Sequence, residues 1–156
     1  MDTEHDDRHP TILELDDGTL MCTFFSSRFV RVAYARYMLS HDGGQTWTNP
    51  MDVPGKPQGT SFGNGSAIAL RDGTVVWVMS GRFDAARPHN CIGVLRSNDR
   101  ARSFELAATI GTDHTLEKPT IAEVADGQLT MAMRREGDVC FSPDGGRTWR
   151  ESATTG

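Results

Sequence analysis

The sequence contains no long apolar run, and no segment approaches the roughly 18 apolar residues that a membrane span needs. Residues 1–7 are acidic and lack the positively charged and then apolar pattern of a signal peptide. Basic residues are in deficit, with 16 Lys and Arg against 21 Asp and Glu and a net charge of -5. That balance argues against a nucleic-acid-binding protein, which usually carries a basic excess. We therefore expect neither a membrane nor a nucleic acid as a partner.

Cysteine is scarce as well. The three cysteines are an odd number without metal-ligand spacing, and each lies in an apolar stretch: Cys22, Cys91 and Cys140. Free cysteines in such stretches are usually small buried hydrophobic residues, which argues against a disulfide scaffold. We expect a cytoplasmic protein that uses neither a metal nor a cofactor.

Helical periodicity is also absent from the sequence. Short apolar segments of five to seven residues lie between turn signals instead, which is typical of β-strands. The 16 Gly and seven Pro among 156 residues predict many turns, and a hydrophobic content of 37% is enough for a core. The composition therefore predicts one all-β domain.

One unit occurs three times along the chain. Its first landmark is an Asp-Gly dipeptide, which recurs after 55 and then 54 residues at Asp17, Asp72 and Asp126. The apolar segments before and after these dipeptides align without a gap. The second landmark is a Ser-x-Asp-x-Gly-x-Thr-Trp box at residues 40–47 and 142–149, which the middle copy keeps without its glycines at 97–104. Such self-similarity is the signature of a repeat architecture.

Each unit is predicted to form four antiparallel strands. Asp-Gly between two apolar runs is a strong hairpin signal, because glycine tolerates the positive φ of a tight turn. A short fourth strand starts at the aromatic residue of each box, and a third strand precedes each box at residues 32–39, 91–96 and 139–141.

Four-stranded units of roughly 50 residues are typical of β-propeller blades. The predicted fold is therefore an all-β propeller segment of three blades, whereas an immunoglobulin-like sandwich would not explain three internal copies. The segment is a single unit over residues 1–156, with repeats at approximately 9–50, 64–107 and 118–150.

The box has a structural interpretation. Its Asp can accept hydrogen bonds from backbone N–H groups of the turn, and its Ser and Thr hydroxyls can bond across the hairpin. Its Trp can fill the gap between one blade and the next. A calcium loop of the EF type needs alternating oxygen ligands and a Glu at its twelfth position, which neither complete box has. We therefore interpret the box as a folding element without a catalytic or metal role.

This box resembles the Asp-box, or bacterial neuraminidase (BNR) repeat, of the sialidase superfamily, and the resemblance covers residues 9–149. It implies a six-bladed propeller, of which three blades are half. The same box also occurs in propellers that are not sialidases, including xyloglucan-degrading enzymes and photosystem assembly factors. The resemblance therefore identifies the fold better than the activity. In sialidases the boxes lie on the face away from the substrate.

The resemblance implies functional residues on the opposite face. The segment from Glu117 to Arg134 is similar to a sialidase segment in which a Glu activates a Tyr nucleophile and an Arg binds the substrate carboxylate. Arg8-His9-Pro10 is similar to the motif that supplies the first carboxylate-binding Arg. A guanidinium suits this task because it can hold a carboxylate with two parallel hydrogen bonds. The predicted catalytic residue is Glu117, and the predicted substrate-binding residues are Arg8, Arg134, Arg28, Arg82 and His89.

The sequence also departs from the sialidase pattern. Sialidases use an Asp general acid in the loop after the second strand of the first blade, and here residues 26–31 contain no acid. They use a Tyr nucleophile, whereas Tyr34 and Tyr37 lie in a predicted third strand. The third Arg of the family would come from a later blade. A pair of carboxyl groups is another route to glycoside hydrolysis. Three carboxyl side chains lie on the right face, without a spacing that selects a pair: Asp84, Glu117 and Glu136.

Three blades do not close a ring, since propellers have about four to eight. Two apolar end faces would stay open, which is a larger patch than soluble monomers usually expose. Either the chain is a piece of a longer protein, or it is a half-ring that pairs with a copy of itself as a two-fold homodimer. The start at Met1 and the end just after the third box favour the homodimer.

Two function classes stay open. The first is a sialidase-like protein directed at glycans, related to the exo-α-sialidase type of glycoside hydrolase but inactive as this chain alone. The second is a non-catalytic propeller that serves as a binding or assembly module. The expected ligand is a glycan or another small acidic molecule.

Overall fold

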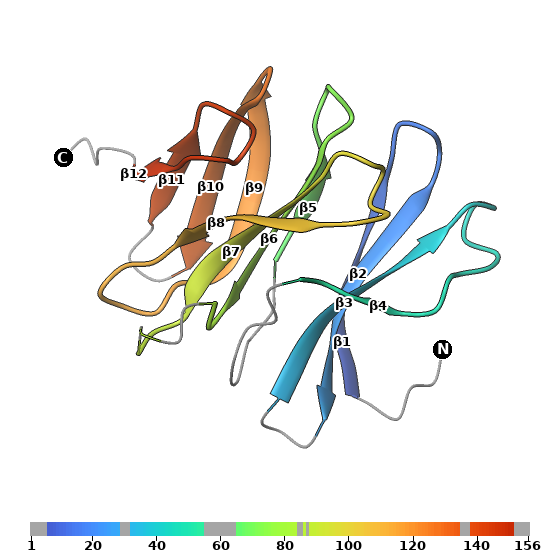
Figure 1. Cartoon of the computed structure of the whole chain (residues 1–156), viewed down its shortest axis with the longest axis horizontal. Coiled ribbons are helices and arrows are strands. Elements are labelled where there is room, and N and C mark those ends of the chain that lie inside the picture. The colour runs from blue at the N-terminus through green and yellow to red at the C-terminus, as the bar shows by residue number, and fades with distance from the viewer. Residues whose placement is uncertain are drawn as a thin grey trace.

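The computed structural model describes residues 6–28, 32–54, 65–83, 86, 88–134 and 138–151, and these residues form three four-stranded antiparallel sheets without a helix (Figure 1). The first sheet contains β1 (Asp6–Glu14), β2 (Leu20–Arg28), β3 (Val32–Ser40) and β4 (Met51–Asp52). The middle sheet contains β5 (Ala67–Ala69), β6 (Val75–Gly81), β7 (Cys91–Ser97) and β8 (Glu105–Ile110). The third sheet contains β9 (Glu117–Ala125), β10 (Gln128–Arg134), β11 (Val139–Ser142) and β12 (Arg150–Glu151).

The prediction of three all-β units of four strands is confirmed. In each sheet the strands pair with their neighbours in chain order, as a meander. The predicted third strands are correct except that each extends one residue further, through the Ser of the box: Ser40, Ser97 and Ser142. No helix among the described residues is long and apolar enough to cross a membrane.

The Asp-Gly dipeptides form the hairpins between the first and second strands. The glycines adopt φ values of 79°, 83° and 67° at positions 18, 73 and 127, which explains the need for glycine. The preceding Asp accepts a backbone hydrogen bond within two of these turns, at 3.0 Å from Thr19 N to Asp17 Oδ1 and 2.9 Å from Thr74 N to Asp72 Oδ1. The predicted hairpins are therefore present, and they are closed by local bonds.

The sheets pack face to face in chain order, with the middle sheet between the other two (Figure 1). One apolar cluster joins the first and middle sheets, with Met21 and Tyr37 against Trp77 and Leu95. A second cluster joins the middle and third sheets, with Val76 and Val94 in contact with residues of β9 to β11. All seven residues of β6 and all seven of β7 are buried, because this sheet has a neighbour on both sides. The first strands of adjacent sheets also touch, β1 with β5 and β5 with β9.

The three cysteines are free and buried, as expected from their apolar surroundings. Cys140 belongs to the cluster between the middle and third sheets. Burial raises the pKa of the Cys22 thiol, which keeps it in the neutral form.

The boxes connect the third strand to the fourth, and their hydrogen bonds confirm the structural interpretation. In the first box the Asp42 carboxylate accepts from the Ser40 hydroxyl at 2.8 Å, from Thr46 N at 2.8 Å and from the Thr46 hydroxyl at 2.6 Å. The Trp47 indole N–H donates to the Gly44 carbonyl at 3.1 Å. The third box repeats this pattern around Asp144. The carboxylate is thus the centre of a closed turn.

The middle box keeps the same geometry without glycine. Asp99 accepts from Ser97, from Ser103 N and from the Ser103 hydroxyl at 2.6 to 2.9 Å. Arg100 and Ala101 take the places of the two glycines and adopt φ values of 58° and 59°. An L-residue in this region costs roughly 1–2 kcal/mol, so the hydrogen bonds and packing of the box hold the backbone against its local preference.

A buried arginine occupies the junction between the middle and third sheets. Arg96 is 5% exposed, and its Nε and Nη1 atoms have no hydrogen-bond partner among the described residues. Burial lowers the pKa of its guanidinium, and the positive charge of Arg147 lowers it further. The carboxylates of Glu105, Asp72 and Asp144 act in the opposite direction. The equivalent positions of the other repeats, counted back from the box Ser, hold the apolar residues Leu39 and Phe141. Arg96 is therefore a charged exception in an apolar layer.

We expect the box carboxylates to make stability depend on acid pH. Hydrogen bonds from the Thr46 hydroxyl and N–H, and from the Ser40 hydroxyl, lower the pKa of Asp42 from 3.8 to about 2. The unfolded chain thus takes up this proton at higher pH than the folded chain. The resulting stability is complete above the unfolded pKa and is lost as the pH falls through the folded one. Urea denaturation at a series of pH values should show this loss, and Asp42→Asn should be less stable at pH 7 and lose less on acidification. An unchanged acid profile in this variant would contradict the assignment.

We expect Arg96→Leu to stabilise the protein. It removes two unbonded, buried polar atoms and restores the apolar residue that the first repeat has at this position, so the free energy of unfolding should rise by about 1–3 kcal/mol. Chemical denaturation measures the change. The control is Arg147→Leu, an exposed position whose replacement should change stability by less than about 0.5 kcal/mol. A loss of stability in Arg96→Leu would show that the guanidinium has a partner that stabilises the fold.

Candidate functional site

The two ends of the sheets differ in character. The box end carries the Asp-Gly turns and the boxes. In the third sheet a backbone hydrogen bond joins the box to the Asp-Gly turn, with Gly145 N donating to the Gly127 carbonyl at 2.7 Å. The loop end carries the opposite connections, from β2 to β3, β6 to β7, β8 to β9 and β10 to β11. Because the strands are antiparallel, the topology places every predicted site residue at the loop end. Arg8 lies near the start of β1, Arg28 ends β2, Arg82 follows β6, His89 precedes β7, Glu117 begins β9 and Arg134 ends β10.

Glu117 and Arg134 are brought together. They are partners in the register of β9 and β10, at the last pair of this hairpin on the loop end. The register shifts by one residue between Ala132 and Arg134, which marks a bulge next to the pair. Glu117 is half-buried and Arg134 is exposed. A glutamate and an arginine that are 17 positions apart in the sequence are thus cross-strand partners in the backbone register.

The starts of β1 and β9 share an unusual backbone. His9 and Lys118 have φ values of 54° and 49°, and each precedes a proline. The residue before proline normally adopts an extended conformation, and a positive φ is uncommon for residues other than glycine. Strain of this kind is often kept at functional sites. Arg8 and Glu117, which directly precede these residues, therefore occupy equivalent and locally constrained positions in two sheets.

His114 is not among the predicted site residues, and it makes two polar contacts at the loop end. Its Nδ1 lies 3.0 Å from Asp113 Oδ1 and its Nε2 lies 2.8 Å from Asp138 Oδ2. Ionised carboxylates only accept hydrogen bonds, so an imidazolium with two N–H groups satisfies both contacts. The hydrogen bond from His114 lowers the pKa of Asp113. The ring thereby joins the β8–β9 connection to the β10–β11 connection. His114 and Asp138 are 24 positions apart, and no sequence motif predicts their contact.

Asp7 was also missed. It pairs with Ser26 in the register of β1 and β2, and its carboxylate accepts a hydrogen bond from the Ser26 hydroxyl. The resemblance to sialidases leads one to look for an acid in the β2–β3 loop, where the sequence has none. The structure supplies a carboxyl group beside the end of β2 from the neighbouring strand instead. Asp84 and Glu136, the other carboxyl candidates, lie outside the described residues, and the Arg28 side chain does so as well.

Packing and backbone bonds tie the other connections of the loop end to the sheets. Leu116 N donates to the Asn90 carbonyl at 3.0 Å, and Met133 N donates to the Asp138 carbonyl at 2.9 Å. The ring of Phe83 lies directly over Gly93 of β7, where a Cβ atom would overlap it. This contact holds the segment after β6, which includes the half-buried Arg82, against the middle sheet.

The Tyr37 side chain lies in the apolar core and not at the loop end. It is 3% exposed, and its ring packs edge-on against Trp77 and Phe104 at centroid distances of 6.2 and 5.1 Å. Its hydroxyl donates to the Arg102 carbonyl at 3.4 Å. Burial raises the pKa of this phenol, and the charge of Asp99 raises it further. A nucleophile needs exposure and a lowered pKa, so Tyr37 does not fit that role. The Tyr34 side chain lies outside the described residues.

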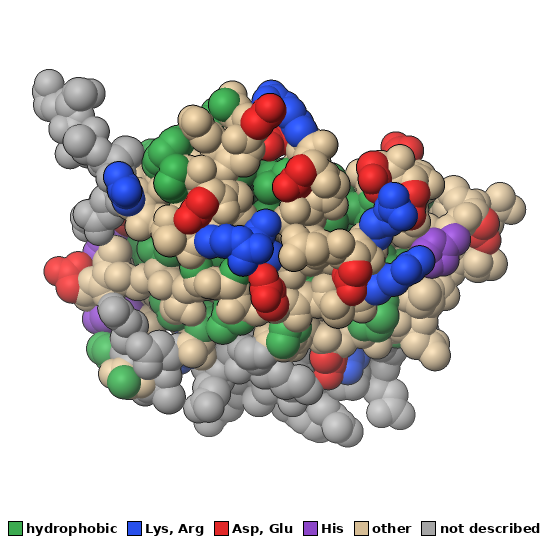
Figure 2. Space-filling model, turned by 45° about the horizontal axis from the view of Figure 1, so that its top comes forward, with side chains coloured by type: hydrophobic (Ala, Val, Ile, Leu, Met, Phe, Trp, Pro, Cys, Tyr) green, Lys and Arg blue, Asp and Glu red, His purple; other side chains and the backbone are tan. Residues whose placement is uncertain are grey.

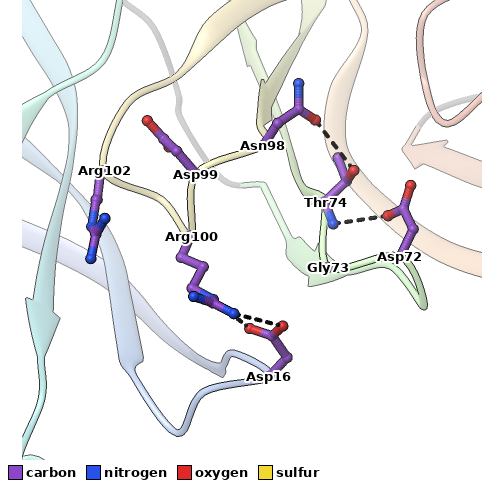
Figure 3. Close-up of a pocket in the computed structure, with 8 residues that line it drawn as sticks. All are labelled: Asp16, Asp72, Gly73, Thr74, Asn98, Asp99, Arg100 and Arg102. Carbon is purple, nitrogen blue, oxygen red and sulfur yellow. Dashed lines mark hydrogen bonds and ion pairs between the residues drawn. The ribbon is translucent and has the colours of Figure 1, made fainter.

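The box end contains a cavity of about 370 Å³ between the first and middle sheets (Figure 3). Arg100 spans it with an ion pair of 3.0 Å to Asp16, and Thr74 donates to Asn98 at 3.3 Å. Figure 2, in which this end comes forward, shows acidic and basic side chains interspersed over the surface. Further ion pairs join the middle and third sheets here, from Arg71 to Asp126 and from Arg147 to Glu105. The charges thus connect neighbouring sheets to one another, and the cavity offers no set of groups aimed at a ligand.

Within the described ranges, no group of three or more His, Cys, Asp or Glu side chains has the arrangement of a metal site. The box carboxylates are the groups that could otherwise bind a cation. Asp42, Asp99 and Asp144 each accept hydrogen bonds from their own turn instead.

A family model described as "BNR repeat-like domain" matches residues 2–156. The chain belongs to this family. The match extends over nearly the whole sequence, and it confirms the resemblance to the sialidase-like BNR superfamily that the boxes indicated. No curated protein matches the chain.

Solved structures support the same fold. A Dyadobacter fermentans protein of unknown function has a TM-score of 0.76 and 18% identity over 92% of this chain and 49% of its own length. The Hadza microbial sialidase Hz136 has a TM-score of 0.75 and 22% identity, over 96% of this chain and 34% of its own. A Fusarium graminearum α-L-arabinofuranosidase, solved with arabinobiose, has a TM-score of 0.69 and 16% identity, over 96% and 49%. These identities establish the fold alone, and the chain spans half or less of the length of each neighbour.

We expect Gly93→Ala to disturb the loop end through Phe83. The added Cβ would overlap the Phe83 ring, so the ring must leave β7 and the segment carrying Arg82 must shift. Overpacking of this kind typically costs about 1–3 kcal/mol of stability. Chemical denaturation measures the loss, and the combined variant Gly93→Ala with Phe83→Ala should recover part of it. Full stability of Gly93→Ala alone would contradict the packing described here.

Proposed function

We propose that the three sheets are consecutive blades of a sialidase-type propeller and that the chain is directed at glycans through its loop end. Three features support the blade assignment: the four-stranded meanders, the contacts between the first strands of adjacent sheets, and the repeated boxes at one end. Propellers commonly place their function on loops at one end of the blades. At the box end the carboxylates of the boxes are used by their own turns and the arginines by ion pairs between sheets, so the loop end is the better candidate for a ligand.

The observation that carries the proposal is the pairing of Glu117 with Arg134 at the end of the third sheet. An arginine there can hold a carboxylate or sugar hydroxyl groups with parallel N–H bonds, while the adjacent carboxylate accepts from a hydroxyl group. Arg8 lies at the equivalent place in the first sheet, because it directly precedes a residue with a positive φ and then a proline, as Glu117 does. Arg82 and His89 lie at the same end, after β6 and before β7, and Arg28 is the last residue of β2. A glycan that carries an acidic group suits this set of side chains.

We propose that this chain alone binds such a ligand without hydrolysing it. Hydrolysis in the sialidase manner needs an exposed tyrosine, and Tyr37 is buried in the core. Asp7 and Glu117 lie at the starts of different sheets, and the Asp7 carboxylate already accepts a hydrogen bond from the Ser26 hydroxyl of the neighbouring strand. Binding requires only the arginines, whereas catalysis would require further groups.

A second candidate is an assembly module that uses the propeller as a surface and has no glycan ligand. The burial of Tyr37 favours it equally, because a propeller without catalytic groups needs no substrate. The two candidates differ in one measurable property, which is affinity for a sugar acid.

We expect isothermal titration calorimetry to detect binding of sialic acid by the wild-type chain, and no turnover of a fluorogenic sialoside or arabinofuranoside. Arg134→Ala should weaken the binding about tenfold or more, because a charged hydrogen-bonded contact is lost. Arg134→Lys keeps the charge but loses the planar pair of donors, so it should recover only part of the affinity.

The matched control is Arg147→Ala, which removes an exposed arginine from the box end of the same sheet and should leave the affinity unchanged. Turnover would establish an enzyme and reject the non-catalytic proposal. The absence of both binding and turnover would favour the assembly module.

A further inference from the structure

We propose that two copies of this chain pack head to tail, the first sheet of each against the third sheet of the other, to form a closed ring of six sheets. The inference rests on the blade assignment made above, and it does not depend on glycan binding. It concerns two surfaces: the leading face, which is the side of the first sheet turned away from the middle sheet, and the trailing face, which is the corresponding side of the third sheet.

The leading face repeats, position by position, the surfaces with which the later sheets pack onto the sheet before them. When the repeats are aligned on their Asp-Gly turns and box serines, six positions of the first sheet form this face: Ile12, Leu20, Cys22, Phe24, Met38 and Trp47. The same six positions of the middle sheet all belong to the cluster with the first sheet: Ala67, Val75, Trp77, Met79, Leu95 and Phe104. In the third sheet they all belong to the cluster with the middle sheet: Ile121, Leu129, Met131, Met133, Cys140 and Trp149.

The strand register independently supports this assignment of faces. Ile12 is opposite Cys22, and Cys22 is opposite Met38, so the three side chains share one side of the first sheet. Trp47 is only half-buried and lies close to Leu20, since both flank the position that a Cβ of Gly44 would take, at 3.7 and 3.6 Å. The Trp149 indole, held by the same bond to its turn, packs into the cluster with the preceding sheet. The first sheet therefore has a complete docking face and no preceding sheet within this chain.

The trailing face repeats the complementary surface. In the first sheet, Leu13, Leu15 and Met21 pack against the middle sheet. The same three positions of the middle sheet pack against the third sheet, and they hold Ile68, Leu70 and Val76. The matching positions of the third sheet are smaller except for Phe141, and they are still largely apolar: Ala122, Val124, Thr130, Ala132, Val139 and Phe141. Small side chains on one face and large ones on the other can interlock at native packing density.

Exposed large hydrophobic side chains occur on these two faces, whereas Cys22 and Phe24 of the leading face are themselves only 8% and 7% exposed. The three exposed large hydrophobic residues of the described chain are Ile12 at 66%, Val124 at 54% and Val139 at 37%. Ile12 lies on the leading face, and the other two lie on the trailing face. Ile121, which has the position of Ile12 in the third sheet, is only 7% exposed, because the middle sheet covers it. The same position thus changes from exposed to buried when a neighbouring sheet is present.

The faces themselves point to a second copy as the occupant. The leading face matches a trailing face and not another leading face, so the contact joins unlike surfaces, and such contacts form a ring where the rotation closes. Two copies bring two leading and two trailing faces, and a closed pair leaves neither exposed. Two copies would supply the length of the Dyadobacter fermentans protein or of the arabinofuranosidase, of which the chain spans 49% each, whereas it spans 34% of the sialidase Hz136.

The primary test is the mass of the full chain in solution, measured by size-exclusion chromatography with light scattering from about 1 to 100 μM. We expect twice the monomer mass of 17.1 kDa over the upper part of this range. A monomer at every concentration would overturn the proposal, and it would leave blades of a longer chain as the occupants of the two faces. A series of larger, open-ended assemblies would also overturn it, because the rotation between copies would then not close.

Two variants test which faces meet. Ile12→Lys and Val124→Asp each place a charge at an exposed position, so each should fold with the circular dichroism spectrum of the wild type and yet be monomeric. Thr109→Asp places a charge on the exposed outer strand of the middle sheet and should remain dimeric. Dimeric Ile12→Lys and Val124→Asp would contradict the assignment of the faces.

Mixing the two monomeric variants separates a head-to-tail ring from other dimers. In a mixed pair, one junction is wild type and the other brings the lysine introduced by Ile12→Lys against the face that carries the aspartate introduced by Val124→Asp. We expect the equimolar mixture to recover a mass of two chains, and no recovery would overturn the head-to-tail arrangement. The calorimetric test of glycan binding is read separately, so a failure of either proposal can be recognised without the other.

Discussion

The structure depends on the burial of sheet faces against one another. A four-stranded sheet of about 40 residues has two broad faces, and a single sheet cannot bury either by itself. The middle sheet illustrates the requirement, because every residue of β6 and β7 is buried between its two neighbours. Each large apolar side chain among them contributes on the order of 1.5–3 kcal/mol when it leaves water. Sheet-on-sheet contact is thus the main source of stability, and the outer faces of the array are its open ends.

The boxes make that stacking regular. Each carboxylate closes its turn with the same three hydrogen bonds, so the aromatic residue that follows is held at the same place in each repeat. Phe104 and Trp149 then both pack toward the preceding sheet. The middle box shows that the hydrogen bonds matter more than the glycines, since Arg100 and Ala101 hold the same positive φ. A local turn therefore controls a contact between sheets.

The difference between the polar groups of the two ends follows from the same geometry. The box end is occupied by its own hydrogen bonds and by ion pairs such as Arg71 with Asp126 and Arg100 with Asp16. The loop end retains charged groups that are only partly committed to the fold, with Glu117 beside Arg134 and His114 between two carboxylates. Strained residues at the start of β1 and β9 lie at this end as well. A rigid stack thus presents a set of polar side chains from several loops.

Much of the fold could be read from the sequence alone. The Asp-Gly dipeptides and boxes determine local turns through bonds between residues two to four positions apart, so the hairpins and strands were predicted to within a residue at the third strands. The structural role of the box was predictable for the same reason, and the burial of the cysteines followed from their apolar surroundings. What the tertiary structure alone decided are contacts between distant segments: the carboxyl group of Asp7 beside Ser26, the bridge from His114 to Asp138, and the unbonded guanidinium of Arg96. These contacts depend on strand register and on the stacking of sheets, and neither leaves a periodic signal in the chain.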